Sequence, residues 1–254
     1  MSEPETTPAL SVVIPTRDRR QRLAETLDAL ATRAVEGGFE VIVVDDASSD
    51  GTGREETALL KDHAKLRYLR HDTRSGQSAA LRTGAAAAIQ PVIATMDGDG
   101  QNDPGDIEKL FVLIGEPDGP GPALAGGVRE KRKATGSRRF ASRFANWVRD
   151  TVLRDECPDS GCGFKVFHRD AFLRLPFFTS MHRYLPALMQ SYGLETAYAS
   201  VNDRPRLAGK SKYTNLGRAL VGLYDMMGVV WLRRRTAVPG IAEDSAKPRQ
   251  KSGG

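Results

Sequence analysis

Cysteine, histidine and aromatic residues are scarce in this sequence. Its 254 residues include two cysteines, four histidines and 7% aromatic residues. Cys157 and Cys162 have no second cysteine pair or histidine pair near them, so the sequence indicates neither a disulfide framework nor a zinc site. The aromatic residues do not alternate with basic residues in a nucleic-acid-binding signature, so we expect no nucleic acid partner.

A long apolar segment is also lacking. The first eight residues are polar and acidic, unlike a secretory signal peptide, which predicts a cytoplasmic protein. Residues 215–235 form an apolar stretch, but Arg218 and Asp225 interrupt it and leave it too short and too polar to span a bilayer. Because it ends in Trp231 and three arginines, it is typical of an interfacial membrane helix, although a core helix or an oligomer contact fits equally well.

The basic residues are distributed unevenly. The net charge is +5 with a pI of about 9.3, and basic side chains gather in residues 129–143 and 233–235. Such clusters attract nucleic acid, anionic lipid or phosphate-bearing substrates, and charge alone does not choose among them. A solvated basic face is the simpler interpretation of either cluster.

Predicted strands and helices alternate through the first hundred residues. Apolar runs predict strands over 10–15, 39–44, 66–69 and 92–96. Helices are predicted over 20–34, from the turn at 45–52 to about residue 62, and over 78–89. This order predicts an α/β fold with a parallel sheet covered by helices on both faces, in which a ligand binds beyond the carboxyl ends of the strands.

Carboxylates follow three of these predicted strands and should meet at one edge of the sheet. They are Asp18 after the first strand, Asp45 and Asp46 after the second, and Asp97 and Asp99 after the fourth. In the last loop, the oxygen-bearing side chains alternate with glycines, which places them on one face and lets the backbone approach a ligand. Hard oxygen donors suit Mg²⁺ or Mn²⁺ held partly by a substrate's phosphates, whereas an ordinary polar turn is the alternative.

Two common nucleotide-binding fingerprints are missing from the sequence. The loop after the first strand, residues 16–19, contains no glycine, and Glu56 stands where a dinucleotide motif beginning at Gly51 would need its third glycine. No loop ends in Gly-Lys followed by Ser or Thr. These absences argue against hydride transfer and against nucleoside triphosphate hydrolysis.

Four motifs follow one another in the sequence. They are Ser-Val-Val-Ile-Pro-Thr at 11–16, Val-Ile-Val-Val-Asp-Asp-Ala-Ser-Ser-Asp-Gly-Thr at 41–52, Met-Asp-Gly-Asp-Gly-Gln-Asn-Asp-Pro at 96–104 and Arg-Leu-Ala-Gly-Lys-Ser-Lys-Tyr at 206–213. In this order they resemble the inverting glycosyltransferases of family 2, and within that family the dolichyl- and polyprenyl-phosphate sugar synthases, such as dolichol-phosphate mannose synthase. The resemblance implies a GT-A, Rossmann-like fold with a mixed, mainly parallel sheet flanked by helices. We expect a flexible N-terminus over 1–9, a GT-A domain over 10–213, an amphipathic membrane-interface helix over 214–236 and a disordered tail over 237–254.

The resemblance also implies a donor site and a metal site. The implied donor nucleotide-binding residues are Pro15, Asp18, Asp45, Asp46, Gly76, Asp97 and Gly98. The implied ligands of Mg²⁺ or Mn²⁺ are Asp97, Asp99 and Gln101. Relatives carry Tyr-Asn-Glu where this chain has Arg17-Asp18-Arg19, so Asp18 is a shorter acid displaced by one position. Gly76 opens a predicted helix whose free N–H groups suit a phosphate, with a cap by Ser78 as the alternative.

An acceptor site and catalytic carboxylates are implied in the second half. The implied acceptor- and diphosphate-binding residues are Arg129, Arg139, Arg143, Arg206, Lys210, Ser211 and Lys212. Residues 159–165 resemble the family's Asp-x-x-Ser-Gly-Phe-Arg segment, which makes Asp159, together with Asp99, a candidate catalytic residue. Since a phosphate acceptor is already ionised at neutral pH, we expect Asp159 to orient rather than deprotonate it.

The sequence therefore predicts a metal-dependent transferase that moves a hexose or hexuronic acid from a UDP- or GDP-linked sugar to polyprenyl phosphate, for cell-envelope glycan or lipopolysaccharide modification. A sugar nucleotidyltransferase and a non-enzymatic basic module that binds lipid or nucleic acid are the alternatives. We expect peripheral contact with the inner face of the cell membrane. A membrane-protein partner and a homo-oligomer are further hypotheses.

Overall fold

The computed structural model describes residues 10–37, 39–52, 66–117, 119–129, 151–202 and 215–239. The strands of this part are β1 (Ser11–Thr16), β2 (Glu40–Asp45), β3 (Leu66–Arg70), β4 (Val92–Thr95), β5 (Leu124–Arg129), β6 (Lys165–His168) and β7 (Thr196–Val201). The helices are α1 (Arg20–Gly37), α3 (Gln77–Ala87), α4 (Ile107–Phe111), α6 (Arg169–Arg174), α7 (Leu185–Ser191) and α8 (Asn215–Arg235), with 3-10 turns η1 (Pro104–Asp106) and η2 (Met181–Arg183). The predictions for residues 1–9, the helix expected to end near residue 62, and the tail from residue 240 lie outside the described residues.

These strands form one mixed sheet in the order β3-β2-β1-β4-β6-β5-β7. The first four in this order, β3, β2, β1 and β4, are parallel to one another, as the alternating pattern predicts. β6 then runs antiparallel to both β4 and β5, and β5 pairs in parallel with β7. The predicted mainly parallel, mixed sheet is confirmed, whereas the individual strands after residue 100 were not predicted.

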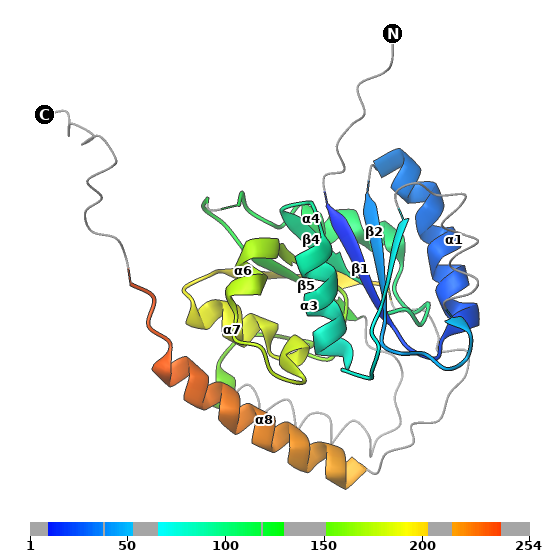
Figure 1. The fold of residues 1–254 in the computed structure, drawn as a ribbon. Helices are drawn as coiled ribbons and strands as arrows, with labels where there is room; N and C mark the ends of the chain where they lie inside the picture. Colours follow the sequence, from blue (N-terminus) through cyan, green and yellow to red (C-terminus); the bar gives the residue numbers. More distant parts are fainter. Residues whose placement is uncertain are drawn as a thin grey trace, which may run out of the picture.

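Side chains alternate between two hydrophobic cores, one on each face of the sheet. Val13 of β1 packs with helices α3, α6, α7 and α8, while Val12 and Ile14 face the side covered by α1 and α4. α3 and α7 lie on the face turned toward the viewer in Figure 1. Burial of both faces explains why the first strands are apolar runs rather than alternating sequences.

Helix α3 lies close to the sheet because most of its buried residues are small, among them Ala80, Gly84 and Ala85. A Cβ atom built on Gly84 would lie 3.2 Å from Cγ2 of Val44 on β2 and closer still to Val13 on β1. This close packing fixes the direction of α3, and so the position of its first turn at the carboxyl edge of β1 and β2. The helix predicted over 78–89 is therefore confirmed, with its ends shifted by one or two residues.

Helix α8 runs along the outside of the domain. Met226 and Val229 are buried and belong to the core that also contains α7, and the Tyr184 hydroxyl donates to the Gly222 carbonyl over 3.0 Å. In Figure 1, α8 crosses the bottom of the view, toward which the carboxyl ends of β1 and β2 also point. Among the described helices, none has both the length and the apolar character required to cross a membrane.

Candidate functional site

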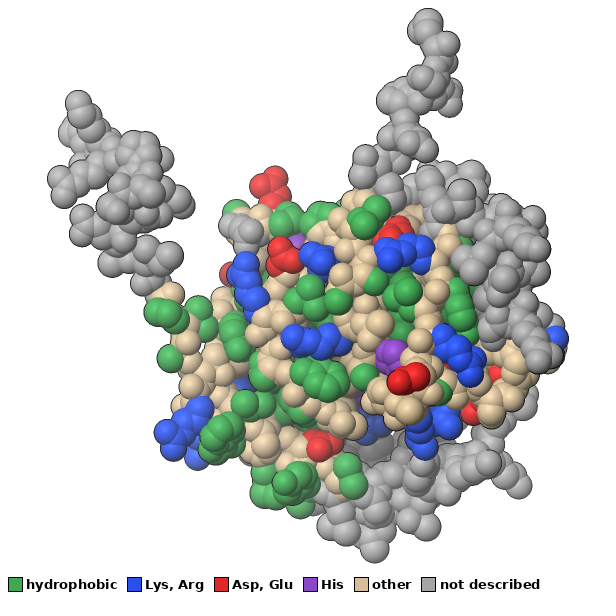
Figure 2. Space-filling view, in the orientation of Figure 1, with side chains coloured by type: hydrophobic (Ala, Val, Ile, Leu, Met, Phe, Trp, Pro, Cys, Tyr) green, Lys and Arg blue, Asp and Glu red, His purple; other side chains and the backbone are tan. Residues whose placement is uncertain are grey.

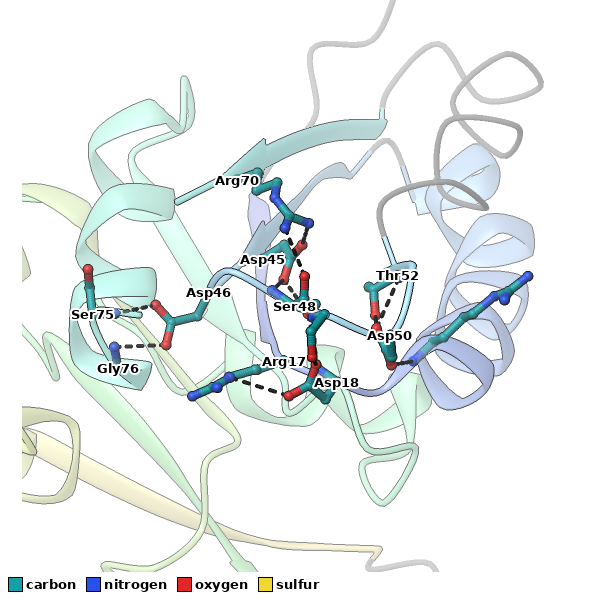
Figure 3. Close-up of polar contacts among 12 residues, drawn as sticks. Arg17, Asp18, Asp45, Asp46, Ser48, Asp50, Thr52, Arg70, Ser75 and Gly76 are labelled. Atoms are coloured by element: carbon teal, nitrogen blue, oxygen red, sulfur yellow. Dashed lines mark hydrogen bonds and ion pairs between the residues drawn. The ribbon is translucent and has the colours of Figure 1, made fainter. Parts of the chain in front are cut away.

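The carboxylate of Asp45 is fully buried at the end of β2. Its Oδ1 accepts hydrogen bonds from the backbone and the hydroxyl of Ser48, and its Oδ2 accepts from the hydroxyl of Tyr68 (2.6 Å) and from Nη1 of Arg70 (2.8 Å). Burial and the bond to Asp45 raise the pKa of Tyr68 to about 12, so the phenol stays protonated and donates. Asp45 thus fixes the loop that follows β2 to the end of β3 (Figure 3).

The neighbouring carboxylate of Asp46 holds the start of α3. It accepts from the backbone N–H groups of Ser75 (2.7 Å) and Gly76 (2.8 Å), as Figure 3 shows. It also contacts Nδ1 of His71 at 3.0 Å. Burial alone would raise the pKa of Asp46, but these hydrogen bonds outweigh it and lower the pKa. The N–H of Gly76, which we expected to bind a donor phosphate, is therefore taken by Asp46. Ser78 does not cap the helix.

Asp18 lies beside this loop at the exposed rim of the same edge. Its Oδ1 accepts from the backbone N–H of Ser49 at 2.8 Å, and its Oδ2 lies 3.4 Å from Nε of Arg17. Asp18 has a positive φ of 49°, a conformation more favourable for Asp than for most residues. Figure 3 shows Arg17 extending from Asp18 toward the side where Gly76 lies.

The loop after β4 carries the predicted metal ligands. Asp97 accepts from Nε2 of Gln77 at 2.9 Å, and its backbone N–H donates to Asn102 at 2.9 Å. Burial, and next the negative charge of Asp99, raise the pKa of Asp97. In the described part of the chain, no three His, Cys, Asp or Glu side chains come together as a metal-binding group. The loop therefore offers two neighbouring carboxylates, an incomplete set of the kind that a substrate's phosphates complete.

Asp159 forms a bidentate ion pair with Arg129 at the end of β5. Nε and Nη2 of Arg129 each lie 2.8 Å from a carboxylate oxygen, and the Arg129 backbone N–H donates at 3.3 Å. Burial would raise the pKa of Asp159, but the hydrogen bonds and charge of Arg129 lower it below its ordinary value. Asp159 therefore stays ionised near neutral pH and orients the guanidinium.

His182 lies beside the first turn of α3. Its Nδ1 is 2.8 Å from the Ser78 hydroxyl, which also accepts from the His182 backbone N–H at 3.4 Å. Burial, followed by the charges of Arg183 and Lys165, lowers the pKa of His182 to about 3, so the imidazole is neutral. The tautomer of this neutral ring decides whether the Ser78 hydroxyl donates to Nδ1 or accepts from it.

The first turn of α3 brings these segments together. Gly76 contacts Asp46 of the β2 loop, Gln77 contacts Asp97 of the β4 loop, and Ser78 contacts His182 of the η2 segment. The expected meeting of acidic loops at one edge is thus present. The expected residues Arg139, Arg143, Arg206, Lys210, Ser211 and Lys212 lie outside the described residues.

Several polar residues at this edge were not singled out from the sequence. They are Tyr68, Arg70, His71 and Gln77. The signal of Tyr68 and Arg70 was weak, because β3 is short and only partly buried. Gln77 lies in the stretch 74–84, which resembles a helix start of the family, but its side chain was not singled out there. Arg70 is the most important of them, since it neutralises the buried Asp45 and also donates to the Ser48 carbonyl over 2.8 Å.

An α/β domain with acidic loops at the carboxyl edge of parallel strands has the arrangement of a nucleotide-dependent enzyme. The sequence model of the family described as Glycosyl transferase family 2 matches residues 11–175. The chain belongs to this family, and the resemblance noted in its motifs is confirmed.

Two curated relatives extend this comparison. A dodecaprenyl-phosphate galacturonate synthase of Rhizobium johnstonii is 30% identical over 244 residues, which cover 91% of this chain and 69% of that protein. An undecaprenyl-phosphate 4-deoxy-4-formamido-L-arabinose transferase of Yersinia pestis is 27% identical over 230 residues, covering 89% of this chain and 69% of that protein.

Solved structures support the GT-A fold. Glucosyl-3-phosphoglycerate synthase from Mycobacterium tuberculosis, in complex with Mg²⁺ and uridine diphosphate, aligns with a TM-score of 0.66 at 17% identity, covering 92% of this chain and 81% of that one. A mannosyltransferase from Pyrobaculum calidifontis, in complex with GDP-Man and Mn²⁺, aligns with a TM-score of 0.65 at 18% identity, covering 94% and 68%. At these identities the similarity establishes the fold alone.

The contacts of Asp46 predict a pH-dependent contribution to stability. Because its pKa is lowered in the folded state, the contribution is present above the ordinary value of 3.8 and is lost as the pH falls through the folded pKa. We expect Asp46→Asn to lower the free energy of unfolding by about 1–3 kcal/mol at pH 7, since a partly buried backbone N–H loses its charged acceptor. Urea denaturation at pH 7 and pH 3 measures the difference. Asp28→Asn, on an exposed position of α1, is the control; an equal loss for Asp46→Asn at both pH values would contradict the prediction.

Proposed function

We propose that this glycosyltransferase moves a sugar from a nucleotide diphosphate sugar to a polyprenyl phosphate. The observation that carries the proposal is the meeting of the Asp46, Asp97 and His182 segments at the first turn of α3, on the edge where a donor binds in such folds. The names of both curated relatives specify a polyprenyl-phosphate product or acceptor.

The donor nucleotide would lie over the ends of β1 and β2. Pro15, Asp18, Asp45, Asp46 and Gly98 surround this edge. Asp45 and Asp46 are engaged by internal hydrogen bonds, so they shape the pocket, whereas Asp18 is the most exposed carboxylate of this group and can accept from a base or ribose. The bases of both uridine and guanosine donors present an N–H group from which a carboxylate can accept a hydrogen bond. The name of the relative from Rhizobium johnstonii makes nucleotide diphosphate-linked galacturonate the first donor to test.

The β4 loop fits a divalent cation. Asp97 and Asp99 repel each other, and a cation between the donor diphosphate and these carboxylates would relieve that repulsion. Asp97, Asp99 and Gln101 would hold Mg²⁺ or Mn²⁺ together with the diphosphate, and the bound ion would supply Lewis-acid stabilisation of the leaving group. Structural neighbours are crystallised with either ion.

The transfer itself needs no strong base. An ionised phosphate oxygen of the lipid attacks the anomeric carbon, a carbon–oxygen bond to that phosphate forms, and the bond to the nucleoside diphosphate breaks. Arg129 is suited to hold the acceptor phosphate, because a guanidinium matches its geometry and Asp159 fixes its direction. Asp159 is a positioning residue in this proposal, in agreement with the expectation that it orients rather than deprotonates.

The outer face of α8 suits contact with the membrane that holds the acceptor. Its exposed large hydrophobic side chains are Val221, Leu223, Tyr224, Met227 and Trp231, and the helix ends in Arg233, Arg234 and Arg235. Figure 2 shows hydrophobic side chains gathered along this helix beside basic ones. Contact with the inner face would bring the lipid phosphate to the edge where the donor binds. A membrane-protein partner and a homo-oligomer are predicted from the sequence alone, and no contact described above bears on either.

The donor assignment predicts metal-dependent turnover. Purified protein should release UDP or GDP from one class of nucleotide sugar only when polyprenyl phosphate and Mn²⁺ or Mg²⁺ are both present. Asp99→Ala should lower this rate by about 100-fold or more, since losing a ligand costs at least as much as losing an outer-sphere partner. Asp72→Ala, an exposed carboxylate between β3 and α3, is the control. Undiminished turnover in Asp99→Ala would remove this loop from the proposal.

The Arg129–Asp159 ion pair predicts a defect confined to the acceptor. Asp159→Asn weakens a charge-assisted contact of about 1.5–3 kcal/mol, so kcat/KM for polyprenyl phosphate should fall by about 10- to 100-fold. Donor affinity, measured by calorimetry with UDP or GDP and Mn²⁺, should change little. Arg129→Lys, which keeps the charge but loses the bidentate geometry, should give the same pattern. A matching loss of donor affinity would place the pair on the donor side instead.

The exposed face of α8 predicts binding to anionic vesicles. Each large apolar side chain that enters the interface contributes about 1.5–3 kcal/mol, so Trp231→Ser should weaken co-sedimentation by about tenfold or more. Ile89→Ser is a matched control, because Ile89 is 70% exposed but lies at the amino end of β4. Equal binding by both variants, or no binding by the unmodified chain, would count against this orientation.

A further inference from the structure

The carboxylate of Asp97 lies directly against the backbone of Gly163, in the segment that connects Asp159 to β6. A Cβ atom built on Gly163 would lie 2.6 Å from Oδ1 and 2.7 Å from Cγ of Asp97, and closer still to Oδ2. Real Cβ atoms essentially never approach other heavy atoms this closely. The position of the carboxylate therefore depends on the absence of a side chain at residue 163.

The backbone around Gly163 is held in place from two sides. The Thr95 hydroxyl on β4 donates to the Gly163 carbonyl over 2.7 Å, and the Gly127 N–H on β5 donates to the Phe164 carbonyl over 3.0 Å. Phe164 is fully buried in the core that faces α1 and α4. A side chain at residue 163 therefore cannot be accommodated by withdrawing this segment from Asp97.

The carboxylate of Asp97 is the part that can move. The Asp97 carboxylate can turn about the two rotatable bonds of its side chain. The Gln77 side chain that contacts it is exposed, so Gln77 can follow this movement. Gly163 has no positive φ, so alanine is compatible with its backbone conformation. A methyl group at residue 163 should thus displace the carboxylate while leaving the fold intact.

The same segment also supports this corner of the site through charge. Lys165 is buried on β6, and its ammonium donates to the Cys162 carbonyl. It lies near enough to Asp97 and to Asp159 that its positive charge favours the ionised form of both carboxylates. The segment from Asp159 to Lys165 thus contacts the acceptor-side ion pair at one end and the predicted metal ligand at the other.

We propose that Gly163 is a positioning residue for the divalent-cation site, and that the acceptor-side segment 159–165 sets the position of the donor-side ligand Asp97. This inference rests on the proposed function, because it takes Asp97 to be a ligand of the cation. It implies that the position of the cation ligand depends on the acceptor-side segment, because the two are in direct contact at Gly163. Any substituent at residue 163 weakens cation binding without touching the cation.

The test compares Mn²⁺ affinity in the full chain, measured from the electron paramagnetic resonance of free Mn²⁺ with UDP or GDP present. Gly163→Ala should weaken Mn²⁺ binding by about 10- to 100-fold, the range for a partner that orients a ligand. Its circular dichroism should not change, and its Tm should fall by less than about 8 °C. Gly126→Ala is the matched control, since a Cβ there would crowd the Tyr198 ring at 3.0 Å and not the site; it should leave Mn²⁺ affinity unchanged.

A second comparison isolates the route through Asp97. In an Asp97→Asn background, Gly163→Ala should weaken Mn²⁺ binding by less than about twofold further, because the two substitutions act on the same ligand. Independent, multiplying losses would overturn the inference. So would wild-type Mn²⁺ affinity in Gly163→Ala, or a variant that does not fold, since the backbone rather than the carboxylate would then have given way.

The outcome also separates this inference from the proposed function. If the unmodified chain binds no Mn²⁺ with either nucleotide, the metal-dependent donor site fails. If it binds Mn²⁺, and Asp99→Ala abolishes binding while Gly163→Ala does not change it, the donor site stands and only the role of Gly163 is rejected.

Discussion

The cost of burying carboxylates at the carboxyl edge of the sheet governs this structure. A buried carboxylate must be compensated by donors or by positive charge. Asp45 is compensated by Ser48, Tyr68 and Arg70. Asp46 is compensated by the N–H groups that open α3, and Asp159 by Arg129. Apart from the contact between Asp45 and Ser48, each of these contacts joins two segments that are distant in the sequence. The same contacts therefore both neutralise charge and assemble the edge.

Asp97 differs from Asp46 and Asp159. Hydrogen bonds lower the pKa of those two, whereas burial and the nearby charge of Asp99 raise the pKa of Asp97. Lys165 and Gln77 compensate it only in part. The edge therefore contains carboxylates whose pKa is lowered by their contacts and one, Asp97, whose pKa is raised. In the proposed function, this difference favours the β4 loop as the place for a cation and makes Asp45 and Asp46 walls of the pocket.

The arrangement of α3 connects the segments to which the proposed function assigns the donor and the acceptor. Its first turn contacts the β2 loop, the β4 loop and the η2 segment through three consecutive residues, and the segment after Asp159 packs against Asp97 from the opposite side. A displacement of any one of these segments would be felt by the others, because the contacts are short and the packing around them is dense. α8 lies on the side of the molecule toward which the same edge points (Figure 1).

Sequence alone determined the fold class, the first four strands with helices α1 and α3, and the family. These features depend on local patterns: buried parallel strands are apolar runs, and helices repeat every three or four residues. The motifs also located the acidic loops.

Tertiary structure decided the antiparallel insertion of β6 between β4 and β5, the pairing of Arg129 with Asp159, and the partners of Asp45 and Asp46. These contacts join residues far apart in the chain, and they are set by the packing of segments rather than by spacing within any one of them. The role of Gly163 is of the same kind, because only the folded chain places the carboxylate of Asp97 where a side chain at that glycine would be.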